Sequence, residues 1–329
     1  MRLSRKMGDR FDGYRVKNVT GPFLLIPYIM KTRVDSQVYY DDDIEITALE
    51  EFIREHREEY PGLSLYHLII AAVLRTYSQR PYLNRFVYDS KIYARNHFCV
   101  SMMVKKGVNV KGEETLVKPE LPIDGTLADV VEAFNKAVEV NKDVKNSNEM
   151  DDTTLNLGHL PHWLIKLAIN TIMFFDKKNV MPKFFYKASP FHTGFFITNI
   201  GSIGIEPIYH HIYEFGTTSI FLAIGKKRSV IASDEKGGVI KRRFMGIKLV
   251  CDERICDGHY YAESARVFMR LIKHPEMLLV PPEQIFVDDG ISKLYDRYLI
   301  DETTGKKTKE KFRENDKYQV HRFHGDTAK

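Results

Sequence analysis

Residues 250–258 read Val-Cys-Asp-Glu-Arg-Ile-Cys-Asp-Gly, and they join a strand pattern to a helix pattern. The run Gly246–Asp252 before them is strand-like, and Val250 and Cys251 alternate within it. The run Tyr260–Lys273 after them has helical spacing and stops at His274-Pro275, because a proline disfavours helical backbone in the residue before it. The stretch therefore predicts a strand, a short loop and a final helix.

The chain on both sides continues this alternation of strands and helices. Thr47 is expected to N-cap a helix that starts at Ala48, and Ser64 to cap a buried helix over 65–79. A third helix is predicted over 127–142. The remaining predictions are an apolar helical run over 160–175 and strands at 38–46, 98–104, 194–200 and 219–224.

These elements predict one α/β domain, a mixed α+β two-layer sandwich with a large mixed sheet flanked by helices. Residues 1–35 are interpreted as an N-terminal arm, 36–287 as the domain, and 288–329 as a charged C-terminal tail. The last 29 residues hold eight Lys/Arg and six Asp/Glu with few aliphatic side chains, which predicts a mobile or peripherally packed tail.

Composition limits the classes of function. Of the 329 residues, 43% are hydrophobic and 28% charged, as in ordinary soluble proteins. No apolar run approaches the roughly 20 residues needed to span a bilayer, so no membrane partner is expected. Three cysteines favour a reducing compartment, and we therefore expect the protein to be cytoplasmic. No nucleic-acid module and no metal-ligand spacing are recognised.

The densest basic stretches flank a hairpin expected around Gly237-Gly238. They are Lys226-Lys227-Arg228 and Lys241-Arg242-Arg243. One interpretation is a solvated rim of the hairpin, and the other is a patch that binds phosphate groups.

Four segments in the second half of the chain carry a resemblance to a known family. They are Gly194–Gly201 (G-F-F-I-T-N-I-G), Phe215–Gly225, Asp252–Gly258 (D-E-R-I-C-D-G) and Ala265–Leu279. In order and spacing they resemble the catalytic domain of the superfamily of chloramphenicol acetyltransferase and the dihydrolipoyl acyltransferases of 2-oxoacid dehydrogenases. The family signature reads D-H-R-x-x-D-G, so Glu253 stands at the position of the catalytic histidine.

The resemblance implies a chloramphenicol acetyltransferase-like fold that assembles as a trimer or a multiple of trimers, with an active site between neighbouring subunits. CoA thioester is the implied substrate, and no tightly bound cofactor is expected. No lipoyl domain is recognised in this chain. By position, Thr198 is implied to stabilise the oxyanion. Asp257 is implied to be tied to an arginine, and Gly258 to permit the turn into the last helix.

Glu253 is the residue that decides the chemistry. Imidazole has an unperturbed pKa of about 6.5, which suits a general base, whereas a glutamate near 4.3 accepts a proton poorly from a thiol near 8.5. Burial raises the pKa of a carboxylate and would make Glu253 a better base. The other interpretation is that Glu253 pairs with an arginine, such as Arg254, and only holds the loop.

Several histidines and cysteines near the signature are also considered for a chemical role. His259 is a possible rescue base or a surface histidine, and His192 and the pair His210-His211 lack metal-ligand spacing. Cys251 and Cys256 are interpreted as small buried hydrophobic residues.

Two functions therefore remain open. The first is acyl transfer from a CoA thioester to a thiol or hydroxyl, altered or reduced because Glu253 replaces the histidine. The second is a non-catalytic trimeric or cage-forming core that still binds a CoA-like ligand.

Overall fold

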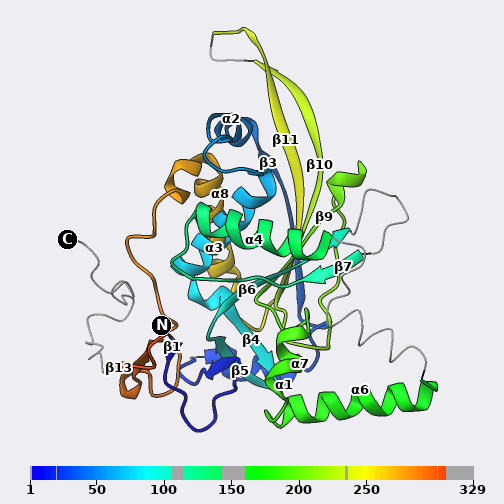
Figure 1. Ribbon diagram of the computed structural model, residues 1–329, viewed down its shortest axis with the longest axis vertical. Coiled ribbons are helices and arrows are strands. Elements are labelled where there is room, and N and C mark those ends of the chain that lie inside the picture. The colour runs from blue at the N-terminus through cyan, green and yellow to red at the C-terminus, as the bar shows by residue number, and fades with distance from the viewer. Residues whose placement is uncertain are drawn as a thin grey trace.

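A seven-stranded mixed sheet forms the centre of the molecule, in the order β3-β11-β10-β9-β6-β7 with β8 also paired to β6. The computed structural model describes residues 2–19, 21–105, 114–142, 160–233, 236–301 and 303–308. Figure 1 shows the arrangement of the elements. The strands are β1 (Arg2–Leu3), β2 (Gly13–Arg15), β3 (Gln37–Glu45), β4 (Arg85–Tyr88), β5 (Lys91–Arg95), β6 (Phe98–Lys105), β7 (Glu114–Val117), β8 (Glu120–Leu121), β9 (Phe195–Asn199), β10 (Ile220–Ser233), β11 (Val239–Asp252), β12 (Leu299–Ile300) and β13 (Lys307–Thr308).

Some of the helices gather on one side of this sheet, and others, among them α6 (His162–Lys177), lie at one end of the molecule (Figure 1). The α-helices are α1 (Ile26–Ile29), α2 (Thr47–Glu55), α3 (Leu65–Gln79), α4 (Leu127–Lys142), α6 (His162–Lys177), α7 (Lys183–Ala188) and α8 (Gly258–Lys273). Short 3-10 helices are η1 (Gly21–Leu24), η2 (Pro81–Asn84), η3 (Ile200–Ile203), η4 (Pro275–Leu278) and η5 (Leu294–Asp296). Strand β9 runs parallel to both β10 and β6, whereas β11 is antiparallel to β10 and β3. The predicted large mixed sheet with flanking helices is confirmed.

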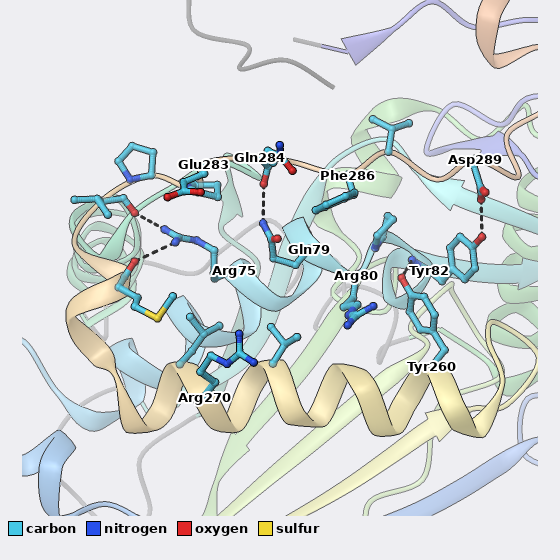
Figure 2. A pocket seen from close by; sticks show the side chains of 18 residues that line it. Arg75, Gln79, Arg80, Tyr82, Tyr260, Arg270, Glu283, Gln284, Phe286 and Asp289 are labelled. Atoms are coloured by element: carbon cyan, nitrogen blue, oxygen red, sulfur yellow. Dashed lines mark hydrogen bonds between the residues drawn. The ribbon is translucent and has the colours of Figure 1, made fainter. Parts of the chain in front are cut away.

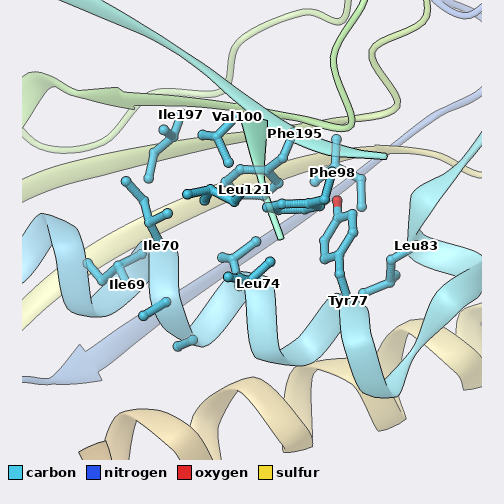
Figure 3. Packing of buried hydrophobic residues seen from close by; sticks show 14 of the residues in the cluster. Ile69, Ile70, Leu74, Tyr77, Leu83, Phe98, Val100, Leu121, Phe195 and Ile197 are labelled. Atoms are coloured by element: carbon cyan, nitrogen blue, oxygen red, sulfur yellow. The ribbon is translucent and has the colours of Figure 1, made fainter. Parts of the chain in front are cut away.

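The main core lies between the sheet and α3. This helix is apolar almost all round, and its side chains from Leu68 to Leu74 are buried. Figure 3 shows Leu74 and Tyr77 of α3 reaching toward Phe98 of β6 and Phe195 of β9. The rings of Tyr77 and Phe98 meet edge to face with centroids 4.8 Å apart. A smaller cluster covers the opposite face of the sheet and consists of Phe196, Ile212, Phe221 and Val250.

Most predicted elements form where the sequence placed them, and one predicted cap does not. Ser64 is the N-cap of α3, and its backbone N–H donates to Nδ1 of His67 at 3.1 Å. Thr47 was expected to cap α2, but Ile46 is the N-cap and Thr47 is already helical. The hydroxyl of Thr47 instead accepts from the backbone N–H of Arg243 on β11 at 2.9 Å, so a contact with the sheet replaces the cap.

The basic residues of the β10–β11 hairpin lie close to acidic side chains. Lys226 pairs with Glu206, Lys227 and Arg243 pair with Glu50, Arg228 with Asp43, and Arg242 with Glu45. A phosphate-binding patch requires cations that are not already neutralised. These pairs therefore favour the solvated-rim interpretation.

The first and last described segments of the chain are paired with each other. Strand β1 pairs with β12, and Arg297 forms a buried ion pair with Asp9 at 2.6 Å. Asp288 is likewise buried against Arg85 at 2.6 Å. The division into arm, domain and tail remains a prediction, and residues 309–329 of the tail lie outside the described residues. Over the described ranges, no helix combines the length and apolar character needed to cross a bilayer.

Candidate active site

The loop that joins β11 to α8 is held by a buried cluster of charges. Asp252, the last residue of β11, accepts two hydrogen bonds from Arg254, from Nε at 2.8 Å and from Nη2 at 2.7 Å. Nε of Arg33 lies 3.6 Å from the same carboxylate. Burial lowers the pKa of Arg33, because desolvation disfavours its charged form, and Asp252 opposes that effect. This cluster fixes the start of the loop.

The structure contradicts two pairings between a carboxylate and an arginine that were expected for this loop. The interpretation that Glu253 pairs with Arg254 is wrong, because Arg254 binds Asp252 instead. Asp257 was implied to be tied to an arginine, but it is exposed and N-caps α8, where Oδ1 accepts from the backbone N–H of Tyr260 at 2.7 Å.

Gly258 begins α8 without any steric demand for glycine. Its backbone is not left-handed, and a Cβ placed there meets no heavy atom within 4 Å. The turn therefore does not require the glycine that the resemblance implied.

Glu253 is half-buried and is held by its backbone, whose N–H donates to the carbonyl of Ser36 at 2.8 Å. Its carboxylate has no hydrogen-bond or ion-pair partner among the described residues. The side chain lines a cavity of about 340 Å³ between the sheet and helices α3 and α8. That volume lies in the range of small-ligand pockets.

The walls of this cavity are almost entirely apolar, and we call it the Glu253 cavity. The sheet contributes Val38, Phe195, Ile220, Leu222, Ile247, Leu249 and Cys251, and the helices contribute Val73, Ala262, Ala265 and Phe268. The hydroxyls of the lining residues already have acceptors. Four donate to backbone carbonyls, Thr76 to Ala72, Tyr77 to Gly194, Tyr261 to Asp252 and Ser264 to Tyr260, and two donate to side chains, Tyr39 to Gln37 and Tyr40 to Asp42. Glu253 is therefore the one charged residue among those that line the cavity.

Thr198 does not face the Glu253 cavity. On β9, Phe195 and Ile197 join the main core, whereas Phe196 joins the cluster on the opposite face. Because strand side chains alternate, Thr198 shares the face of Phe196.

The strand register also separates Thr198 from Glu253. Thr198 is level with Ala223 of β10, and through it with Lys248 of β11. Lys248 precedes Glu253 by five residues, or roughly 17 Å at about 3.4 Å per residue. One chain therefore does not bring the two predicted catalytic residues together.

The histidines singled out in the sequence lie outside the Glu253 cavity. His259 is exposed on the first turn of α8 and is not a lining residue. His192 is buried, with Nε2 3.1 Å from Oδ2 of Asp176 and Nδ1 2.8 Å from Oγ of Ser189. Burial lowers the pKa of His192 despite the carboxylate beside it. No group of His, Cys, Asp and Glu in the described part of the chain could hold a metal ion.

Both cysteines near the loop are buried, as predicted. Burial raises the pKa of the Cys251 and Cys256 thiols, because an apolar environment disfavours the thiolate. A nucleophilic cysteine requires the opposite shift.

A second and larger cavity, which the sequence did not indicate, lies beside α3 and α8 (Figure 2). Its volume is about 650 Å³, and residues 280–289 form its outer wall. Most polar groups there fasten that wall. Arg75 donates to the carbonyl of Met277 at 3.0 Å, Gln79 to that of Gln284 at 2.6 Å, and the hydroxyl of Tyr82 to Asp289 at 2.5 Å. Arg270 and Glu283 also line this larger cavity. The Glu253 cavity is nevertheless the candidate for chemistry, because Glu253 of the β11–α8 loop lines it.

Part of the chain matches a known family. Residues 191–280 match the sequence profile described as 2-oxoacid dehydrogenases acyltransferase (catalytic domain). A dihydrolipoyllysine-residue acetyltransferase component of the pyruvate dehydrogenase complex from Rickettsia typhi is 30% identical over 87 residues, which are 26% of this chain and 21% of that protein. The chain thus spans about a fifth of the length of this relative. The resemblance stated from the sequence is confirmed over this segment, which contains the β11–α8 loop.

Two solved structures have a similar arrangement of elements. One is a probable dihydrolipoamide acetyltransferase from Listeria monocytogenes, with a TM-score of 0.49, 13% identity, and coverage of 78% of this chain and 93% of that chain. The other is a chloramphenicol acetyltransferase, with a TM-score of 0.40, 12% identity, and coverage of 75% and 91%.

Proposed function

We propose that this protein transfers an acyl group from a CoA thioester to a thiol or hydroxyl acceptor, with Glu253 as the proton acceptor. One observation carries the proposal: a carboxylate without a described partner, Glu253, lines an apolar cavity. The resemblance stated from the sequence implies that this is the position of the family's catalytic histidine. The segment that contains it matches an acyltransferase catalytic domain.

The reaction follows from these groups. Glu253 takes the proton of the acceptor thiol, and the sulfur attacks the thioester carbonyl to give a tetrahedral oxyanion. The C–S bond to CoA then breaks, and the leaving thiolate recovers the proton from Glu253. The apolar walls exclude water, which protects the thioester from hydrolysis. Because glutamate is intrinsically a weaker base than histidine, we expect slower turnover than in a histidine enzyme.

The donor for the oxyanion belongs to a second copy of the chain in this proposal. Thr198 lies on the other face of the sheet and roughly 17 Å along the strands from Glu253, so a complete site requires a neighbouring subunit. In a homotrimer or a multiple of trimers, the sheet face that carries Thr198 in one subunit can lie beside the Glu253 cavity of its neighbour.

A second candidate, a non-catalytic oligomeric core, is favoured by the same separation of Thr198 from Glu253. In that case the Glu253 cavity fills a structural role or binds a CoA-like ligand without reaction. The two candidates differ in whether the acceptor accelerates the release of CoA.

The test is the release of CoA from acetyl-CoA, with and without dihydrolipoamide, across a range of pH. Glu253→Gln should reduce the acceptor-dependent rate about 100-fold or more, within the range attributed to general bases. Glu283→Gln, a carboxylate on the other cavity, is the matched control and should have no effect. No acceptor-dependent release at any pH, in the wild type or in Glu253→His, would establish the non-catalytic core instead.

Subunit mixing tests the shared site. Thr198→Val and Glu253→Gln should each be nearly inactive alone. When the two variants are unfolded and refolded together, mixed oligomers contain some sites with both native residues, so activity should return. No recovery in a refolded mixture of confirmed oligomers would contradict a site shared between chains.

A further inference from the structure

The Glu253 cavity follows the two elements that meet at the β11–α8 loop. On β11, every second residue from Ile247 to Glu253 lines it. On α8, the lining residues lie between Gly258 and Phe268, a span of about 15 Å along the helix axis. Because the strand and the helix are joined beside Glu253, both rows of lining residues lead away from that residue. The cavity is therefore elongated, with Glu253 near the joined ends of the two rows.

Small side chains leave this space open. Cys251 of β11 and Ala262 and Ala265 of α8 are among the lining residues. The cavity of about 340 Å³ has room for about eleven water-sized groups, at about 30 Å³ for each. An acetyl group consists of two carbons and an oxygen, so it would leave most of the cavity unfilled.

The walls of the cavity select an apolar ligand. Its floor contains Phe195, Ile220 and Leu222, which are buried. The hydroxyls of the lining residues already have acceptors, and Glu253 is the one charged residue among them. A polar ligand would lose its hydrogen bonds to water here without replacement, whereas an aliphatic chain is stabilised when it leaves water.

One side of the cavity is open to solvent. Tyr39 and Tyr40 of β3 and Ala262 of α8 line it and are themselves exposed. A ligand can therefore enter beside β3 and α8, while its apolar end reaches the buried floor.

We propose that the acyl group of the CoA thioester is an aliphatic chain of about six to ten carbons, which lies in the Glu253 cavity with its carbonyl carbon beside Glu253. This inference rests on the proposed function, because it names the acyl group of the same reaction. The CoA part of the thioester carries phosphates, whose charges an apolar cavity excludes. The acyl chain is then the part of the thioester that the walls fit.

A series of thioesters tests the proposal. The release of CoA is followed from acetyl-, butanoyl-, hexanoyl-, octanoyl- and hexadecanoyl-CoA, with dihydrolipoamide held constant. Each methylene that leaves water favours binding about fourfold, so kcat/KM should rise at least about 100-fold from acetyl- to octanoyl-CoA. It should fall again for hexadecanoyl-CoA, whose chain is too long for the cavity.

Two variants of α8 change the cavity in opposite directions. Ala265→Leu fills part of it and should lower the ratio of kcat/KM for octanoyl-CoA to that for acetyl-CoA about tenfold or more. Phe268→Ala removes a ring from the wall farthest along α8 and should move the preferred acyl group to a longer chain. The matched control is Val267→Leu, which changes a residue that lines the larger cavity and should leave the ratio unchanged. Thermal unfolding checks that each variant is folded.

Isothermal titration calorimetry separates this inference from the proposed function. If no thioester is turned over, but octanoyl-CoA binds more tightly than acetyl-CoA and Ala265→Leu abolishes the difference, acyl transfer is wrong and the cavity still takes the chain. If acetyl-CoA is turned over at least as well as octanoyl-CoA, acyl transfer stands and this inference is overturned. Equal ratios in Ala265→Leu and Val267→Leu would also overturn it, because the chain would then lie elsewhere.

Discussion

At the scale of single residues, two adjacent carboxylates have opposite roles. Asp252 is fully buried, hydrogen-bonded to Arg254 and paired with Arg33 across 3.6 Å, whereas Glu253 lines an apolar cavity without a described partner. Breaking a buried charge pair leaves an uncompensated charge, while removing an unpaired carboxylate does not. The stability of the loop therefore rests on Asp252, and Glu253 is available for function.

The first prediction compares the two amide substitutions. Asp252→Asn should lower the free energy of unfolding by about 3 kcal/mol, because it leaves buried Arg254 and Arg33 without their counter-ion. Glu253→Gln should change it by no more than about 0.5 kcal/mol. Urea denaturation of both variants checks this. A large loss in Glu253→Gln would mean that the carboxylate holds the loop after all.

The second prediction concerns acid stability. Burial lowers the pKa of His67 from 6.5 to about 4, so the unfolded chain binds the proton first as the pH falls. The contribution of His67 is present above pH 6.5 and is lost as the pH falls toward 4. Its largest size is about 3 kcal/mol. In His67→Asn, whose side-chain oxygen can accept from Ser64, unfolding free energy should fall less steeply over this range.

Sequence reasoning succeeded where an interaction was local and failed where it depended on distant segments. The cap at Ser64, the bounds of α4 and the end of α8 at Lys273 follow from neighbouring residues, whereas α8 begins at Gly258, two residues before the predicted start. The partner of Arg254 is an exception, because Asp252 is only two residues away but the sequence does not show which carboxylate the arginine faces. The approach of Arg33 to the same carboxylate depends on a distant segment. Likewise, the apolar pattern of α6 predicts a helix, but only the tertiary structure shows that Trp163, Leu167 and Phe174 on it are exposed.

At the scale of elements, close approach of backbones governs one of the two glycine turns in the segments that carry the resemblance, and not the other. Gly201, after β9, lies against β10, and a Cβ there would meet the carbonyl oxygen of Gly225 at 2.1 Å. Gly258, the first residue of α8, has open space around it. Only the first glycine is therefore required by the packing, although both belong to the segments that carry the family resemblance.

The third prediction follows from this contrast. Gly201→Ala should destabilise the fold by about 2 kcal/mol or more, because backbone atoms of β10 cannot move aside cheaply. Gly258→Ala should be neutral or stabilising by up to about 1 kcal/mol, because alanine has the higher helix propensity. Thermal unfolding of the two variants measures both effects. Equal destabilisation would show that Gly258 has a steric role in the assembled protein.

At the scale of the whole molecule, segments near the two ends of the described chain pack against each other. Arg297 donates to the carboxylate of Asp9 at 2.6 and 3.1 Å and to the carbonyls of Ser4 and Ser292 at 2.8 and 2.7 Å. Strand β1 pairs with β12 beside this contact. The regions interpreted as arm and tail thus share one buried junction, which no local pattern in either region indicates.

The fourth prediction tests whether this junction belongs to the cooperative fold. Arg297→Leu should cost about 3 kcal/mol or more, because it leaves Asp9 buried without its counter-ion. Adding Asp9→Leu should recover part of that loss, since both charges are then removed. If arm and tail were peripheral, unfolding monitored by Trp163 and by far-ultraviolet circular dichroism would be unchanged in both variants. A shared shift of both signals would place the domain boundary outside residues 9–297 rather than at 36 and 287.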